Sequence, residues 1–146
     1  MGVNPPFLIM YLDKTIKSDA FKISKEEIIE FATKYDPMFF HLDESKAEES
    51  IFSELVLSGL HTICIILQKM NQFSDWKIAT GLEHTVKYFK PVKPNINYQV
   101  SGLVIYEHTW KNPMYTHLKM TNLLREKDSV IDLVSLDTSF LIYTPE

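Results

Sequence analysis

The sequence predicts an α+β fold in which one long central helix is wrapped by a curved antiparallel β-sheet. Two observations predict it. Residues 60–70 are apolar on nearly every side, which is typical of a helix buried over most of its surface. From Lys77 onward, runs of β-branched and aromatic residues alternate with turn signals. Strands joined by such short connections pair antiparallel.

The first helix is predicted to begin at Ser24 and to end at about Tyr35. Ser24 and Glu27 have the spacing of a capping box, in which a hydroxyl and a carboxylate satisfy free amides of the first turn. Pro37 disfavours helical geometry at Asp36, so the helix ends there. The predicted buried stripe consists of Ile28, Ile29, Phe31, Ala32 and Tyr35.

Two further helical segments are expected before the strands. Residues 43–49 read as a short, solvated surface connector that Asp43 can cap. The long apolar helix then begins at Ser58, whose side chain can cap its first turn.

Four strands are predicted, over residues 78–89, 96–110, 114–124 and 130–143, with turn signals at Pro91, Pro94, Pro113 and Asp128 between them. The short connections favour an antiparallel meander, and an extra strand is expected near residues 21–23.

Size, composition and charge fit one globular domain spanning residues 1–146. Hydrophobic residues make up 45% of the chain and charged residues 23%, which excludes a disordered chain. The formal charge of −4 gives no attraction for a phosphate backbone, so nucleic acid is not an expected partner.

Neither a membrane span nor a metal site is expected from the sequence. The longest apolar stretches, such as residues 7–12 and 63–67, are too short to cross a hydrocarbon core of about 30 Å. Residues 1–12 lack a secretory signal and Cys64 is the single cysteine, which predicts a cytoplasmic protein. The separations of His41, Asp43, His61 and Cys64 match no usual zinc pattern.

Asp36 and His41 flank an apolar turn and form the first candidate site. On a continuous helix their side chains would point about 140° apart, but Pro37 removes that geometry. In a folded-back loop the carboxylate and the imidazole can converge, as a base and an acid acting on water must. Phe40 supplies apolar surroundings that strengthen their electrostatics. The alternative is that Asp36 ends its helix and His41 is a packed loop histidine.

Ser58 and Gly59, at the start of the apolar helix, form the second candidate site. Free amides and a positive partial charge gather at a helix N-terminus, and both suit an oxyanion. The alternative is an ordinary Ser-Gly helix start.

Together the two sites resemble the MaoC-like dehydratase and R-specific enoyl-CoA hydratase family of hot-dog proteins. The resemblance rests on residues 31–44, Phe52, residues 58–62 and residues 86–94, and it covers nearly the whole chain. It implies the hot-dog fold, homodimers that share an active-site groove, and syn hydration of a trans-2-enoyl thioester. Coenzyme A or acyl carrier protein would be part of the substrate, and no other cofactor is implied.

The resemblance also assigns roles to single residues. Asp36 and His41 fall on the family's catalytic pair, and Gly59 falls on the glycine whose amide holds the thioester carbonyl. The residues expected to bind the substrate are Ser58, His61, Phe40, Phe52 and Lys90. For His61 a packed position is an equal alternative, and for Lys90 the alternative is a solvated strand end.

The sequence departs from the family pattern at three places. Ser58 stands before Gly59 where many relatives have histidine, and Asn95 replaces a common glycine. Ser53 and Glu54 replace a pair of small residues, and Glu54 is expected to narrow the groove or alter its charge. Two other functions use the same fold, namely a thioesterase and a non-catalytic thioester-binding subunit. For the thioesterase, the activating carboxylate expected on the long helix is missing.

Overall fold

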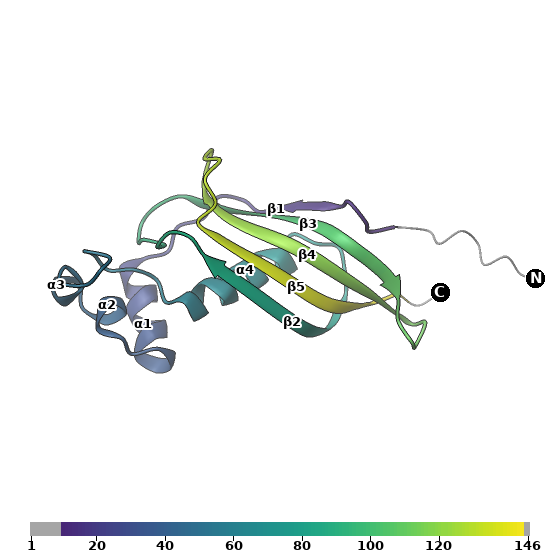
Figure 1. The fold of residues 1–146 in the computed structure, drawn as a ribbon, viewed down its shortest axis with the longest axis horizontal. Coiled ribbons are helices and arrows are strands. Elements are labelled where there is room, and N and C mark those ends of the chain that lie inside the picture. The colour runs from purple at the N-terminus through teal and green to yellow at the C-terminus, as the bar shows by residue number, and fades with distance from the viewer. Residues whose placement is uncertain (1–9, 145–146) are drawn as a thin grey trace, which may run out of the picture.

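In the computed structural model, which describes residues 10–144, a five-stranded antiparallel sheet packs against helix α4 (Figure 1). The predicted α+β class and hot-dog architecture are confirmed. Residues 1–9 and 145–146 lie outside the described part of the chain. Part of the apolar stretch 7–12, and most of the segment 1–12 considered for a secretory signal, therefore lie outside it too. The elements are β1 (Thr15–Lys17), α1 (Lys25–Tyr35), α2 (Phe39–Leu42), α3 (Glu44–Ala47), α4 (Gly59–Gln72), β2 (Ile78–Tyr88), β3 (Tyr98–Thr109), β4 (Tyr115–Glu126) and β5 (Val134–Tyr143).

The strand order is β1-β3-β4-β5-β2, so the predicted meander is correct only for the last three strands. β2 pairs with β5 and lies at the opposite side of the sheet from β3, its successor in the chain. The connection over residues 89–97 makes this crossing possible. Its Val92 is buried and accepts a 2.8 Å hydrogen bond from the Leu57 amide, which ties the crossing to the segment before α4.

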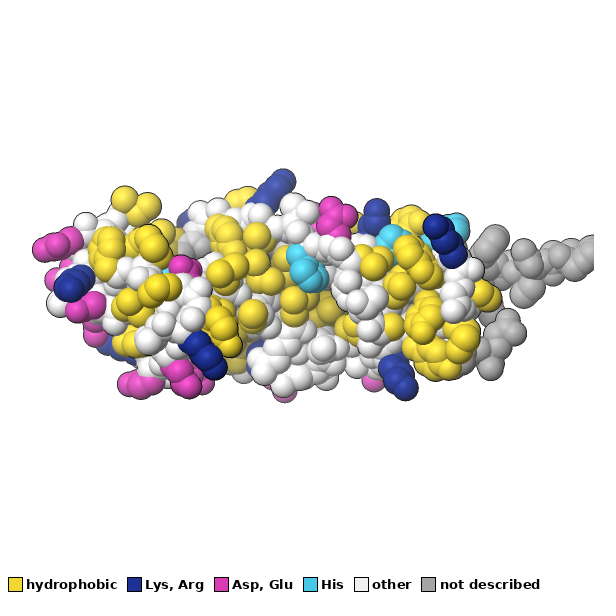
Figure 2. Space-filling view, turned by 90° about the horizontal axis from the view of Figure 1, so that it is seen from below, with side chains coloured by type: hydrophobic (Ala, Val, Ile, Leu, Met, Phe, Trp, Pro, Cys, Tyr) yellow, Lys and Arg dark blue, Asp and Glu magenta, His cyan; other side chains and the backbone are white. Residues whose placement is uncertain are grey.

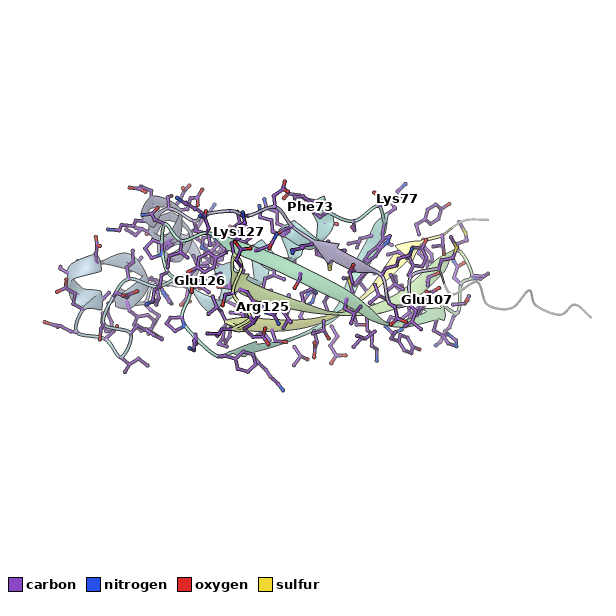
Figure 3. All side chains as sticks on the ribbon, turned by 90° about the horizontal axis from the view of Figure 1, so that it is seen from above. Phe73, Lys77, Glu107, Arg125, Glu126 and Lys127 are labelled. Carbon is purple, nitrogen blue, oxygen red and sulfur yellow. The ribbon has the colours of Figure 1, made fainter. Side chains whose placement is uncertain are left out.

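The extra strand lies earlier than predicted. β1 pairs with β3 at residues 15–17, whereas Phe21 forms only an isolated bridge with Tyr98. The Glu107 carboxylate accepts hydrogen bonds from the amides of Tyr11 (2.6 Å) and Leu12 (2.8 Å), just ahead of β1 (Figure 3).

The last strand begins at Val134, four residues later than predicted, because residues 127–133 form the β4–β5 turn. Within this turn Asp128 has a positive φ of 65°. Across the base of this turn, Nε of Arg125, a residue labelled in Figure 3, donates a 2.6 Å hydrogen bond to Oδ1 of Asp132.

The capping box of α1 is confirmed, since Ser24 accepts from the Glu27 amide and the Glu27 carboxylate accepts from the Ser24 amide. Asp43 caps α3 as predicted. The buried stripe of α1 is narrower than expected, because Tyr35 is 60% exposed.

Helix α4 is not buried on most sides, which corrects the prediction from its composition. Its fully buried residues are Thr62, Ile66 and Met70, whereas Leu60 is 52% exposed and Cys64 is exposed too. The sheet covers only one side of the helix. Apolar composition therefore overstated how much of α4 is covered within a single chain.

The β2 edge is also exposed. One side of β2 pairs with β5 and the other has no strand neighbour in the described sheet. Hydrophobic side chains cover much of the face seen from this side (Figure 2). Leu82 on β2 is 45% exposed, and Phe89 just after it is 56% exposed.

Candidate active site

The end of helix α1 places the first functional side chain. Asp36 is the C-cap, with φ −155° and ψ 70°, and its amide donates to the Ala32 carbonyl. Pro37 keeps Asp36 out of helical geometry, as its position in the sequence predicted. The Asp36 side chain is 26% exposed and points toward the start of α4, where Ser58 meets it.

The short helix α2 brings His41 to Asp36. His41 is buried, and its Nδ1 atom lies 2.7 Å from the Val56 carbonyl oxygen. Because a carbonyl only accepts, Nδ1 carries the hydrogen and Nε2 is the nitrogen that faces Asp36. The distance from Nε2 to Oδ2 of Asp36 is 3.5 Å. The two groups thus converge across the apolar turn.

Ser58 contacts the same carboxylate. It occupies the N-cap position of α4, but its side chain caps no amide, contrary to the prediction. Instead its hydroxyl, fully buried, donates a 2.6 Å hydrogen bond to Oδ2 of Asp36. The charged carboxylate is a strong acceptor for the hydroxyl hydrogen and orients the side chain toward Asp36. Ser58 is therefore placed to orient Asp36 rather than to line the groove.

Gly59 begins α4, so its amide has no partner within the helix. Tyr88, the last residue of β2, packs against Gly59: a β-carbon added to Gly59 would lie 2.6 Å from the Tyr88 hydroxyl oxygen. Burial, and after it the negative charge of Asp36, raises the pKa of Tyr88. Sequence reasoning missed Tyr88 as a site residue, because only the pairing of β2 with β5 brings it to α4.

A cavity of about 320 Å³ opens beside these groups. It brings together five of the residues singled out in the sequence. Those five are His41, Gly59, Phe40, Phe52 and Lys90. The rest of its wall is largely apolar and comes from the segment before α4 and from residues 88–92. Such a cavity suits an acyl chain that ends in a polar head group.

The structure places His61 elsewhere. It lines a separate cavity of about 470 Å³ between α1 and α4, with Phe31 stacked on its ring at 4.4 Å. Burial lowers the pKa of His61, against the opposing charge of Glu27, and Nδ1 is buried without a hydrogen-bond partner in the described chain. This cavity is the larger one, but neither Asp36 nor His41 lines it.

Glu54 points away from the groove. Its carboxylate lies 3.1 Å from Nζ of Lys93, both side chains are nearly half exposed, and Glu54 does not line the 320 Å³ cavity. The expectation that Glu54 narrows the groove is therefore not supported by its position.

The structure of residues 10–144 also bears on metal binding and on membrane insertion. Within this part of the chain, no group of three His, Cys, Asp or Glu side chains could hold a metal ion. Over the same residues, no helix is long and apolar enough to cross a membrane.

Comparisons with known proteins identify the family and agree with the fold. Residues 11–121 match the model of the MaoC like domain family. An uncharacterized protein of Bacillus subtilis (strain 168), YdeM, is 30% identical over 87 residues, which cover 58% of this chain and 62% of that protein. The chain thus matches less than two thirds of that relative's length.

Solved structures share the fold. A MaoC-like dehydratase from Rhodospirillum rubrum has a TM-score of 0.83 at 20% identity, covering 94% of this chain and 95% of that one. An R-hydratase from Pseudomonas aeruginosa, unliganded, has a TM-score of 0.70 at 16% identity, covering 94% and 84%. An (R)-hydratase from A. caviae has a TM-score of 0.62 at 13% identity, covering 94% and 99%.

Proposed function

Because this chain belongs to the MaoC-like domain family, we propose that it adds water to a trans-2-enoyl thioester, or removes water from the (3R)-hydroxyacyl thioester. The observation that carries the proposal is the meeting of Asp36 and His41, whose carboxylate and imidazole lie 3.5 Å apart beside the start of α4. Hydration needs a group that orients water and a group that moves its proton.

The proposed roles follow from the hydrogen bonds around the pair. With Nδ1 donating to Val56, Nε2 of His41 is free to accept a proton from water. Asp36 accepts the second O–H of that water and steers the oxygen onto C3. His41 then delivers the proton to C2, so that the C–O and C–H bonds form on one face and the π bond is lost.

Negative charge grows on the thioester oxygen as water attacks C3. The Gly59 amide, at the positive end of α4, is the proposed donor to that oxygen. A preorganised donor at a developing oxyanion contributes about 3 kcal/mol to lowering the barrier. Asp36, His41 and Gly59 carry the proposed steps, and coenzyme A or acyl carrier protein enters as part of the substrate.

The proposed substrate contacts lie in the 320 Å³ cavity. Phe40 and Phe52 would contact the acyl chain, and the Lys90 ammonium would contact phosphates of the carrier. His61 is not assigned to this substrate, because it lines the other cavity.

A homodimer is proposed as the working form. β2 is an eleven-residue strand with one unpaired side, and a second copy can pair with it antiparallel about a two-fold axis. The exposed Leu60 on α4 and Leu82 on β2 would be covered in such a dimer. Sedimentation of the wild type as a dimer and of Leu82→Lys as a monomer is the expected result; a monomeric wild type would overturn this.

The test of the proposed function is an assay over enoyl thioesters of increasing chain length. We expect loss of the enoyl absorbance and formation of the (3R)-hydroxyacyl product, with no release of free thiol. Release of free coenzyme A would instead indicate a thioesterase. Tight binding of the thioester without any turnover would indicate a non-catalytic binding subunit.

A further inference from the structure

The hydroxyl of Tyr88 occupies the space beside Gly59 where any other residue would carry its side chain. A β-carbon on Gly59 would lie 2.6 Å from the Tyr88 oxygen, 2.7 Å from Cζ and 3.0 Å from Cε1. Contacts under 3.0 Å are essentially never seen for real β-carbons. The phenol can approach the first residue of α4 this closely only because that residue is glycine.

The sheet fixes the approach of Tyr88. The residue ends β2, and its register partner on β5 is Val134, which is fully buried. Val134 also lines the 320 Å³ cavity, together with Tyr88, Gly59 and His41. The tyrosine is thus held by a backbone ladder at the wall where the thioester carbonyl must lie if Gly59 is to bind it.

The electrostatics of the site favour a protonated phenol. Tyr88 is 51% exposed, but its partial burial disfavours the phenolate and the carboxylate of Asp36 disfavours it further, so both raise the pKa of Tyr88. The group therefore keeps its hydrogen at neutral pH and can donate it.

We propose that the Tyr88 hydroxyl is a second hydrogen-bond donor to the thioester oxygen, beside the Gly59 amide, and hence a further catalytic residue. The inference rests on the proposed hydration reaction. A developing enolate oxygen has more than one lone pair and accepts two donors, and each donor that is lost from such a site lowers kcat by about 100-fold or more.

Tyr88→Phe removes the hydroxyl and keeps the ring, so the packing against Gly59 is preserved. We expect kcat for hydration of crotonyl-CoA to fall about 100-fold with little change in KM, because the bond strengthens as charge develops. Tyr106→Phe on β3 is the matched control and should keep the wild-type kcat. A Tyr88→Phe variant with wild-type kcat would overturn the inference while leaving the hydratase function intact.

A second measurement separates this inference from the proposed function. Acetoacetyl-CoA forms an enolate that absorbs in the near ultraviolet. Binding of acetoacetyl-CoA to a site with two donors to the thioester oxygen should raise the fraction of the ligand that is enolate. We expect that signal with the wild type and a smaller one with Tyr88→Phe. Equal enolate fractions in the two proteins would contradict the role of Tyr88, whereas failure of the wild type to hydrate any enoyl thioester of the chain-length series would contradict the hydratase proposal.

Discussion

The Ser58 hydroxyl donates a 2.6 Å hydrogen bond to Oδ2 of Asp36, which joins the N-terminus of α4 to the C-terminus of α1. The same oxygen lies 3.5 Å from Nε2 of His41. Because Ser58 is fully buried, water does not compete for its hydroxyl. The serine and the histidine together define the position of this carboxylate.

Ser58→Ala is expected to lower kcat about 10-fold, because Asp36 loses the donor that orients it. The buried hydrogen bond to a charged group contributes about 1.5 kcal/mol, so the free energy of unfolding should fall by a similar amount. Steady-state kinetics and urea unfolding measure the two effects. Ser45→Ala is the matched control, since it removes a hydroxyl that donates to Asp43 on the surface, 2.8 Å away. An unchanged kcat in Ser58→Ala would contradict the positioning role.

Gly59→Ala is expected to destabilise the chain by about 1 kcal/mol, because the new β-carbon must displace the end of the Tyr88 side chain, which is 51% exposed and can move. Alanine is otherwise the better helix former by roughly 1 kcal/mol. In a Tyr88→Ala background, Gly59→Ala should therefore raise the free energy of unfolding instead of lowering it. A double-mutant cycle by urea unfolding measures this coupling. If the changes in the free energy of unfolding caused by Gly59→Ala and Tyr88→Ala are additive, the position of Tyr88 does not depend on a glycine at residue 59.

Glu54→Gln is expected to change little. The Glu54–Lys93 pair is close to half exposed, and such surface pairs contribute at most about 1 kcal/mol. Neither the chain-length preference of hydration nor kcat should change, because Glu54 lies outside the cavity lining. A shift of preference toward longer acyl chains in this variant would restore Glu54 as a residue that narrows the groove.

His61 should make the stability of the chain depend on pH. Burial lowers the pKa of His61 in the folded chain below its ordinary value of 6.5, so the unfolded chain binds a proton first as the pH falls. The contribution of neutral His61 to the free energy of unfolding is therefore complete above pH 6.5. It is lost as the pH falls from there through the pKa of His61 in the folded chain. The His61→Phe variant keeps an aromatic ring against Phe31. Below pH 6.5 its free energy of unfolding should fall less with decreasing pH than that of the wild type. A decline as steep as in the wild type would exclude His61 as its source.

Local chemistry made much of the fold predictable. The capping box at Ser24, the end of α1 before Pro37 and the Asp43 cap depend on neighbours in sequence, and each is confirmed. Asn95 adopts a left-handed φ of 60° at a turn, a backbone conformation that asparagine tolerates. Ser53 has a φ of 59° at another such position.

Long-range features were not predictable in the same way. The strand order depends on β2 crossing to β5, and no local pattern in residues 89–97 specifies which strand it meets. The same crossing brings Tyr88 to Gly59, so the tyrosine carried no signal as a site residue. The sequence predicts Ser58 as a helix cap because Asp36, the carboxylate to which its hydroxyl donates, lies 22 positions away in sequence. The sequence leaves His61 either in the groove or packed, and helix geometry turns it toward α1.

The most direct test of the central claim is the rate of crotonyl-CoA hydration by Asp36→Asn and by His41→Ala, with folding verified by urea unfolding. We predict a loss of kcat of at least about 1,000-fold in each variant, because one loses the acceptor that orients water and the other loses proton transfer. The Glu54→Gln protein, measured in parallel, should keep the wild-type rate. Hydration at the wild-type rate by either folded variant would contradict the account.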